Sequence, residues 1–276
     1  MTDTPLHPDP WRDVDAQPDA STMADALEVR GRTPAHVRVR RRFLRFIPVR
    51  AGQRVLEVGC GTGAVARDLA AFVGRRGRVV GIDPSRAVLT RARALSRGSA
   101  GARILLREAD GARLPFRDAQ FDVALAVTVI LHVAEPLAVV KEMVRVTRPG
   151  GRVALQDQDF GNVAAAHPDR DTTDAIMSGV ARRIYPEPYS GRRLPGLLLA
   201  AGLERPRLLT DIFQDTTLTP FSKAFLERRA ANALRFGIVD ARGAQRWLDG
   251  FTALVARGSF VLTMNYYGAV ATRPAR

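Results

Sequence analysis

The segment 55–63, with the sequence Val-Leu-Glu-Val-Gly-Cys-Gly-Thr-Gly, holds the residues whose types and spacing most clearly indicate chemistry. Its apolar start predicts a short, buried strand of a parallel sheet, and its three alternating glycines predict a tight loop. Residues 64–70 then begin a helix, with Val65, Leu69 and Phe72 at helical spacing. Strand, glycine loop and helix are together typical of the nucleotide-binding turn of a doubly wound α/β fold, where a residue without a Cβ lets the backbone approach the ligand.

The residues around the glycines indicate which nucleotide the loop binds. Gly59-x-Gly61-x-x-Ala64 satisfies the dinucleotide fingerprint, so an NAD enzyme stays an alternative on the glycines alone. Glu57, however, places a carboxylate near the end of the strand, where it suits a positively charged ligand better than a pyrophosphate. Gly63 completes the pattern Glu-x-Gly-x-Gly-x-Gly.

This pattern resembles motif I of the class I S-adenosylmethionine (SAM)-dependent methyltransferases. Matching segments continue over about residues 50–157 and include the turn Pro149-Gly150-Gly151 before a strand. The resemblance implies an α/β fold with a Rossmann-like, seven-stranded, mostly parallel sheet whose last strand is antiparallel, with helices on both faces and a helical lid. It also implies SAM as cofactor, S-adenosyl-L-homocysteine (SAH) as product and no metal. The resemblance is closest to the ubiquinone/menaquinone-biosynthesis type and to bacterial natural-product methyltransferases.

The same resemblance assigns cofactor contacts to residues that follow the predicted strands. Asp83 ends the strand 78–83 and would accept hydrogen bonds from both ribose hydroxyls, its alternative role being to cap the next helix. Asp110 would accept from the adenine amino group. Arg30, unless it is simply an exposed arginine, would reach the SAM carboxylate. The predicted cofactor-binding residues are Glu57, Gly59, Cys60, Gly61, Gly63, Asp83, Pro84, Asp110, Gly111, Ala112, Val127, Thr128 and Arg30.

Candidates for the transfer chemistry follow the fourth and fifth predicted strands. His132 is the candidate general base because imidazole titrates near neutrality, although a packing role is equally open. Asp157 and Asp159 would point the same way in an extended chain, and they could bind a cationic or hydroxylated acceptor or nothing at all. Tyr185 and Tyr189 are candidates for the wall of the acceptor pocket, or core residues.

The composition of the 276 residues is ordinary for a globular protein, with 46% hydrophobic and 25% charged residues, but the net charge of +14 is high. All but two of the 42 basic residues are arginine. A basic protein invites a nucleic-acid partner. The arginines are nevertheless spread along the chain, and their densest cluster, within 38–45, lies on one side of a predicted helix as a solvated face does. The charge alone does not decide the function.

Other classes of protein are disfavoured by what the sequence lacks. The single cysteine, Cys60, cannot form an intramolecular disulfide or a metal cluster. No segment resembles a signal peptide or a membrane span, so we expect a cytoplasmic protein.

The chain divides by pattern into an arm, a core and a substrate-side half. Residues 1–20 contain four prolines among polar residues and predict a flexible arm that Trp11 could anchor. The fifth strand is predicted over 153–155, and mostly helix over 158–203. The expected units are 1–20 for the arm, 21–48 for N-terminal helices covering the cofactor, 49–157 for the SAM-binding core, and 158–276 for substrate-side helices and final strands, with a lid insertion at 214–257.

The sequence therefore predicts a SAM-dependent methyltransferase that acts on O, N or C of a small-molecule acceptor, in bacterial secondary or quinone-like metabolism. One alternative is an RNA or protein methyltransferase, which the lack of an added RNA-binding module disfavours. The other is a SAM-binding protein with different chemistry on the same fold. We expect a monomer or homodimer with no membrane span and no nucleic-acid partner.

Overall fold

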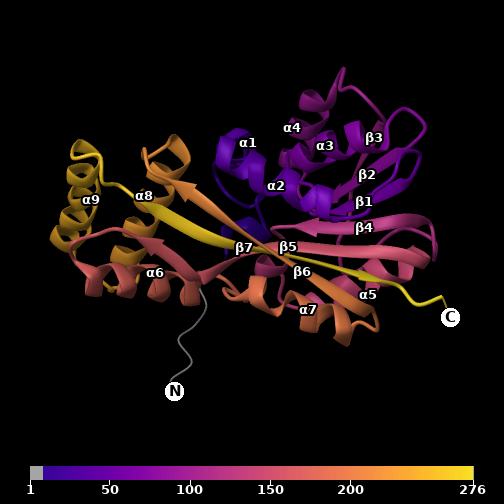
Figure 1. Cartoon of the computed structure of the whole chain (residues 1–276). Helices are drawn as coiled ribbons and strands as arrows, with labels where there is room; N and C mark the ends of the chain where they lie inside the picture. Colours follow the sequence, from indigo (N-terminus) through magenta and orange to yellow (C-terminus); the bar gives the residue numbers. More distant parts are fainter. Residues whose placement is uncertain (1–8, 276) are drawn as a thin grey trace.

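The structure, a computed structural model, describes residues 9–275. Within them one seven-stranded sheet has the order β3-β2-β1-β4-β5-β7-β6 (Figure 1). All neighbouring pairs are parallel except those of β7, which is antiparallel to both β5 and β6. The predicted fold class is confirmed. The strands are β1 (Arg54–Val58), β2 (Arg78–Asp83), β3 (Arg103–Glu108), β4 (Phe121–Val127), β5 (Thr147–Ala165), β6 (Glu204–Asp215) and β7 (Leu262–Thr272).

Helices cover both faces of this sheet, with α2 and α3 on one face and α5 and α7 on the other (Figure 1). None of the described helices is long and apolar enough to cross a bilayer. The helices are α1 (Ala20–Arg32), α2 (Pro34–Phe46), α3 (Ala64–Val73), α4 (Arg86–Ser96), α5 (Pro136–Val146), α6 (Arg170–Ile184), α7 (Ser190–Ala200), α8 (Pro220–Arg235) and α9 (Ala241–Ala256), with the short 3-10 helices η1 (Pro10–Arg12) and η2 (Ile130–His132).

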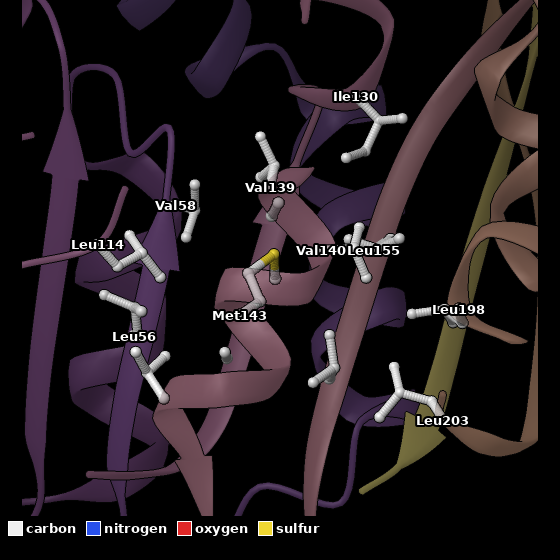
Figure 2. Close-up of a cluster of buried hydrophobic side chains, with 14 of the residues drawn as sticks. Leu56, Val58, Leu114, Ile130, Val139, Val140, Met143, Leu155, Leu198 and Leu203 are labelled. Atoms are coloured by element: carbon white, nitrogen blue, oxygen red, sulfur yellow. The ribbon is translucent and has the colours of Figure 1, made fainter. Parts of the chain in front are cut away.

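The alternation of side chains along the central strands supplies two hydrophobic cores. Leu56 and Leu155 pack on the face covered by α5, against Val140 and Met143 (Figure 2). Val55, one residue earlier in β1, packs on the opposite face in the cluster formed with α2 and α3. Each fully buried side chain of this size contributes roughly 1.5–3 kcal/mol relative to exposure. Because helices and apolar side chains cover both faces of the sheet, the packing fixes the positions of the carboxyl ends of the strands.

Strands β5, β6 and β7 are much longer than the others and extend beyond the core toward α6, α8 and α9 (Figure 1). The sequence predicts the fifth strand only over 153–155 and helix from 158, and this is wrong because β5 runs to Ala165. Its outer part, Val163–Ala165, pairs with β7 after a shift in register. The hydrogen bonds of that pairing satisfy the backbone groups of this segment, although its side chains do not show the apolar pattern of a core strand. The outer helices pack around Trp247, Phe251 and Phe260.

The N-terminal segment lies against the body of the protein from residue 9 onward. Trp11 and Val14 pack with α1 and α4, and the Asp15 carboxylate accepts hydrogen bonds from the Ser85 hydroxyl (2.5 Å) and from the first backbone N–H groups of α4. The pKa of Asp15 is lowered: burial opposes ionisation, but the Ser85 and backbone hydrogen bonds outweigh it. The prediction of a flexible arm over 1–20 is therefore corrected for residues 9–20, and residues 1–8 lie outside the described chain.

Candidate functional site

A cavity of about 840 Å³ lies at the carboxyl ends of the central strands. Its position follows from the sheet order, since the chain reverses direction of winding between β1 and β4 and the loops after these strands diverge there. The loops after β1 to β4 line one end of the cavity. Helices α1, α2 and α8 and residues of β5 and β7 line the rest.

The glycine loop after β1 is held in place by a carboxylate from β2. One oxygen of Asp83 accepts from the Gly61 N–H (2.9 Å), and the other accepts from the Ser85 N–H (3.0 Å). Burial raises the pKa of Asp83. Gly59 has φ +67°, and a Cβ added there would lie 2.4 Å from Cγ2 of Val129, which follows β4. The loops after β1, β2 and β4 thus form one close-packed cradle.

Glu57 lines the cavity beneath this loop and is only 2% exposed. Its Oε2 has no hydrogen-bond partner among the described residues. Burial raises the pKa of Glu57 well above its usual value, and the neighbouring Asp83 adds to the effect. An orphaned acceptor in a buried position is costly, by about 1–3 kcal/mol, unless a ligand satisfies it. A cationic ligand group would do so and would favour the ionised carboxylate.

Arg30, from α1, crosses the cavity to reach three different elements. Its Nη2 donates to the Thr128 hydroxyl (2.9 Å), to Gln158 Oε1 (3.3 Å) and to the Tyr266 hydroxyl (3.1 Å). All these partners are neutral, and within residues 9–275 Arg30 forms no ion pair. Thr128 itself adopts φ +58°, an uncommon conformation for a β-branched residue. A strained residue that binds an unneutralised guanidinium is typical of a functional site.

His132, at the end of η2, faces the cavity beside a buried carboxylate. Its Nδ1 lies 2.5 Å from Asp9 Oδ2, and Asp9 is held in turn by the Trp11 N–H (3.1 Å). The ring of Tyr185 packs edge-on against the imidazole at 5.6 Å. A carboxylate on one imidazole nitrogen sets the tautomer so that the other nitrogen is free to accept a proton.

Asp157 and Asp159 are corrected as acceptor-binding candidates, because neither lines the cavity. They share one face of β5, as predicted, but it is the face toward α7. Asp157 accepts from the backbone N–H groups of Leu131 (2.9 Å) and Gln158 (3.1 Å). Asp159 forms a two-point ion pair with Arg192 of α7. Both carboxylates are fully buried and hold structure.

The alternate residues of β5 face the cavity instead. Gln156, Gln158 and Phe160 line it, together with Met264 and Tyr266 from the paired strand β7. Of these five residues, only Gln158 is predicted from the sequence, as one of the residues that follow the fifth predicted strand near the transferred methyl group. The two-residue period of a strand was available as a signal, but it cannot say which of its two faces meets the cavity.

The two candidate tyrosines separate. Tyr185 lines the cavity and stacks on Phe160 with ring centroids 4.6 Å apart. Tyr189 does not line it, and its ring packs against Arg192 instead. Among the cofactor candidates, only Gly63 is outside the cavity lining, as the N-cap of α3. The others all line it: Glu57, Gly59, Cys60, Gly61, Asp83, Pro84, Asp110, Gly111, Ala112, Val127, Thr128 and Arg30.

Further cavity residues have no motif in the sequence. His36 looks in the sequence like one polar residue of an arginine-rich helix. Phe221 and Phe225 belong to the predicted lid insertion, and they line the cavity. Asp9 is outside the lining but contacts His132, and it comes from the segment predicted to be flexible. Only tertiary contacts bring these side chains to the site.

Three kinds of similarity relate this chain to known proteins. A family model described as a methyltransferase domain matches residues 56–155. An uncharacterized 37.1 kDa protein in transposon TN4556 of Streptomyces fradiae is 31% identical over 93% of this chain and 72% of that protein. The 27-O-demethylrifamycin SV methyltransferase of Amycolatopsis mediterranei is 32% identical over 66% of this chain, and the match spans 65% of the enzyme, less than two thirds of its length.

The fold is also that of solved methyltransferases. The structure of a Haemonchus contortus phosphoethanolamine N-methyltransferase 2, in complex with phosphomonomethylethanolamine and SAH, matches with a TM-score of 0.62 at 20% identity. The match covers 96% of this chain and 60% of that one. At this identity the likeness concerns the fold.

Replacing Asp157 with Asn should remove a pH dependence of stability. Burial raises the pKa of Asp157 to about 6 from an ordinary value of 3.8, so the folded protein binds this proton more tightly than the unfolded chain does. The stabilisation of the folded protein by this proton is complete below about pH 4. It is lost as the pH rises through about 6, and the free energy of unfolding then falls by roughly 3 kcal/mol. The side chain of Asp157→Asn does not titrate, so this variant does not show the fall.

The measurement is urea denaturation of both proteins between about pH 4 and pH 7. The free energy of unfolding of Asp157→Asn, minus that of the parent, should rise across this range. Asp171→Asn, which removes an exposed carboxylate of α6, controls for the loss of one charge. A difference that stays flat for Asp157→Asn would contradict a raised pKa at this buried position.

Proposed function

Because this chain belongs to the class I SAM-dependent methyltransferases, we propose that it transfers the methyl group of SAM to a hydroxyl oxygen of a small, largely apolar acceptor. The observation that carries this proposal is that one cavity is lined both by the glycine-loop cradle and by His132, whose Nδ1 contacts the Asp9 carboxylate. The relative from Amycolatopsis, whose name specifies an O-demethylated acceptor, supports oxygen over nitrogen or carbon.

The residues of the cradle fit SAM chemically. The orphaned oxygen of Glu57 suits the ammonium of the methionine part, and the carboxylate of that part would find the Arg30 guanidinium, which lacks an anionic partner within residues 9–275. Asp83 has lone pairs left for ribose hydroxyls beyond the two backbone bonds that it accepts. Gly59 leaves the space that a Cβ would fill. When bound, SAM supplies an electrophilic methyl group on a good leaving group.

The acceptor end supplies the proton chemistry. With Asp9 accepting from Nδ1–H, the Nε2 of His132 is the unprotonated nitrogen and takes the proton of the acceptor hydroxyl as its oxygen bonds to carbon. Asp9 then stabilises the imidazolium. The aromatic rings of Phe160, Tyr185 and Phe225 exclude water and place the acceptor.

The size of the cavity favours a small acceptor over RNA or protein. At about 840 Å³ it lies near the top of the roughly 300–1,000 Å³ range of small-molecule sites, which suits a cofactor together with a compact acceptor. Several arginines of the basic helix α2 are engaged in ion pairs: Arg38 and Arg42 with Asp211, and Arg40 and Arg41 with Asp68. This basic stripe therefore gives little support to a nucleic-acid surface.

Replacing Asp83 tests the cofactor geometry. Asp83→Ala should abolish detectable SAM and SAH binding in a calorimetric titration, because it removes both the ribose acceptor and the tether of Gly61. Glu108→Gln is the matched control, since Glu108 lies opposite Asp83 on the neighbouring strand but pairs with Arg86 outside the cavity lining. Retained SAM binding in Asp83→Ala would contradict the proposed role of Asp83 in cofactor binding. Binding of NAD alone by the parent would overturn the cofactor assignment.

Gly59→Ala should weaken SAM binding by at least about tenfold, because the new Cβ would collide with Val129 and push apart the loops of the cradle. Gly52→Ala is the matched control. Gly52 has φ +81° and open space around its Cα, so both variants bear the backbone strain, of order 1 kcal/mol, and only one bears the collision. Equal losses of SAM affinity in the two variants would contradict the role of close packing.

Replacing His132 tests the base. His132→Ala should lower turnover by about 10²-fold or more while leaving SAM affinity nearly unchanged. His132→Gln, which keeps a polar side chain that cannot take the proton, should be equally impaired. Turnover is measured as SAH released with a panel of hydroxylated aromatic acceptors. Full activity of His132→Gln would show that His132 has a packing role and is not the base. If the parent binds SAM but releases SAH with no acceptor, a SAM-binding protein with other chemistry is favoured.

A further inference from the structure

The acidic residues of the cavity lining come from one part of the chain, whereas its arginines come from several: Arg12, Arg30, Arg40 and Arg228. The carboxylates in its lining, within the described residues, all belong to or follow strands β1 to β4: Glu57, Asp83, Asp110 and Glu135. None comes from the substrate-side half, 158–276, which contributes Arg228 instead. The part of the lining that comes from residues 158–276 is therefore aromatic and cationic.

Helix α8 presents these properties in one stripe. Phe221, Phe225 and Arg228 follow at intervals of four and three residues, so they share one face of the helix, and all three line the cavity. The rings of Phe221 and Phe225 are nearly parallel, at 19°, and Phe225 is nearly parallel to Phe160, at 11°. A flat aromatic molecule in the cavity can stack against such rings or pack edge-on to them.

Arg228 stands at the end of that stripe without an anionic partner. No ion pair joins it to a carboxylate within residues 9–275, and Glu227, its neighbour in the chain, lies 3.9 Å from Lys223 instead. Arg228 is exposed overall although it lines the cavity, which places it at the mouth. Arg229, next to it, is 4% exposed and packs over the rings of Phe160 and Phe225. Two adjacent positive charges thus meet the aromatic surface from α8.

His36 adds a second unsatisfied group at the inner end. It is 5% exposed and lines the cavity, and neither ring nitrogen has a hydrogen-bond partner in the part of the chain that the structure describes. Its ring lies 4.4 Å from that of Phe221 and 4.5 Å from that of Phe213. Burial, with the charges of Arg30 and Arg40, lowers the pKa of His36 well below its usual value, so the imidazole is neutral. It offers one donor and one acceptor to a ligand.

We propose that the methyl acceptor is an anionic aromatic compound, whose flat body lies along Phe221 and Phe225, whose acid group binds Arg228 at the cavity mouth, and whose polar substituent hydrogen-bonds to His36. This assignment of the substrate class rests on the proposed function. Charge attraction to Arg228 would also draw the acceptor toward the mouth from solution.

The test uses one pair of probes that differ only in charge, 6-hydroxy-2-naphthoate and 6-hydroxy-2-naphthamide. Each is titrated calorimetrically into the full chain, with and without saturating SAH. We expect the acid to bind at least about tenfold more tightly than the amide, and the difference to shrink with added salt. Arg228→Gln should remove the difference. Lys223→Gln is the matched control, because it removes one positive charge from the same helix outside the cavity lining.

His36→Phe supplies an independent readout. The substitution removes an unsatisfied buried polar group, so the thermal midpoint should rise or hold, whereas binding of both probes should weaken by about tenfold.

The outcomes separate the two proposals. Failure of SAH to bind would overturn the proposed function. Normal SAH binding with equal affinities for acid and amide, with no binding of the acid, or with equal effects of Arg228→Gln and Lys223→Gln, would overturn the anionic acceptor alone.

Discussion

The antiparallel pairing of β7 between β5 and β6 is the constraint on which the acceptor half of this protein depends. Inside the core it completes the sheet, and beyond the core it continues from Val163 to Ala165 of β5 against the start of β7. Without those outer hydrogen bonds the extension would expose unpaired backbone groups. With them, the extension reaches toward α6, α8 and α9, and Phe160 of β5 and Tyr266 of β7 line the cavity.

The charged groups in and around the cavity differ in whether the protein itself supplies their partners. Taking a charge out of water is costly, so a buried ionic group normally has a partner in the protein or in a ligand. Asp157, Asp159 and Asp83 have theirs in backbone N–H groups or an arginine. Glu57 and Arg30 lack ionic partners within the described residues, and they lie where a zwitterionic amino acid group would supply both. The unmatched groups therefore indicate ligand positions. A matched group can hold structure alone, as Asp157 and Asp159 do, or hold a loop and keep lone pairs for a ligand, as we propose for Asp83.

This distinction also explains how far the sequence could lead. The glycine loop, Asp83 and the strand order follow from local patterns, because each strand-to-loop segment carries its own signal within a few residues. The face of β5 does not, since alternation places Asp157 and Asp159 together without saying on which side. Asp9 and His132 are 123 residues apart, so no local pattern could reveal their contact, although Asp9 also accepts from the nearby Trp11 N–H. The stripe on α8 reads as an ordinary amphipathic helix until the cavity is known.

Several features of the site cost stability when no ligand is bound. Thr128 holds a left-handed backbone conformation, Glu57 and His36 have buried atoms without partners among residues 9–275, and Gly59 leaves space that a side chain would fill. A strained backbone and a buried polar atom without a partner each cost about 1–3 kcal/mol. Such costs persist only where the surrounding structure stabilises the strained arrangement. Here the two filled faces of the sheet supply that stabilisation. A ligand that hydrogen-bonds to these residues removes part of the cost. Cofactor binding should therefore stabilise the fold through Glu57, and acceptor binding should stabilise it through His36.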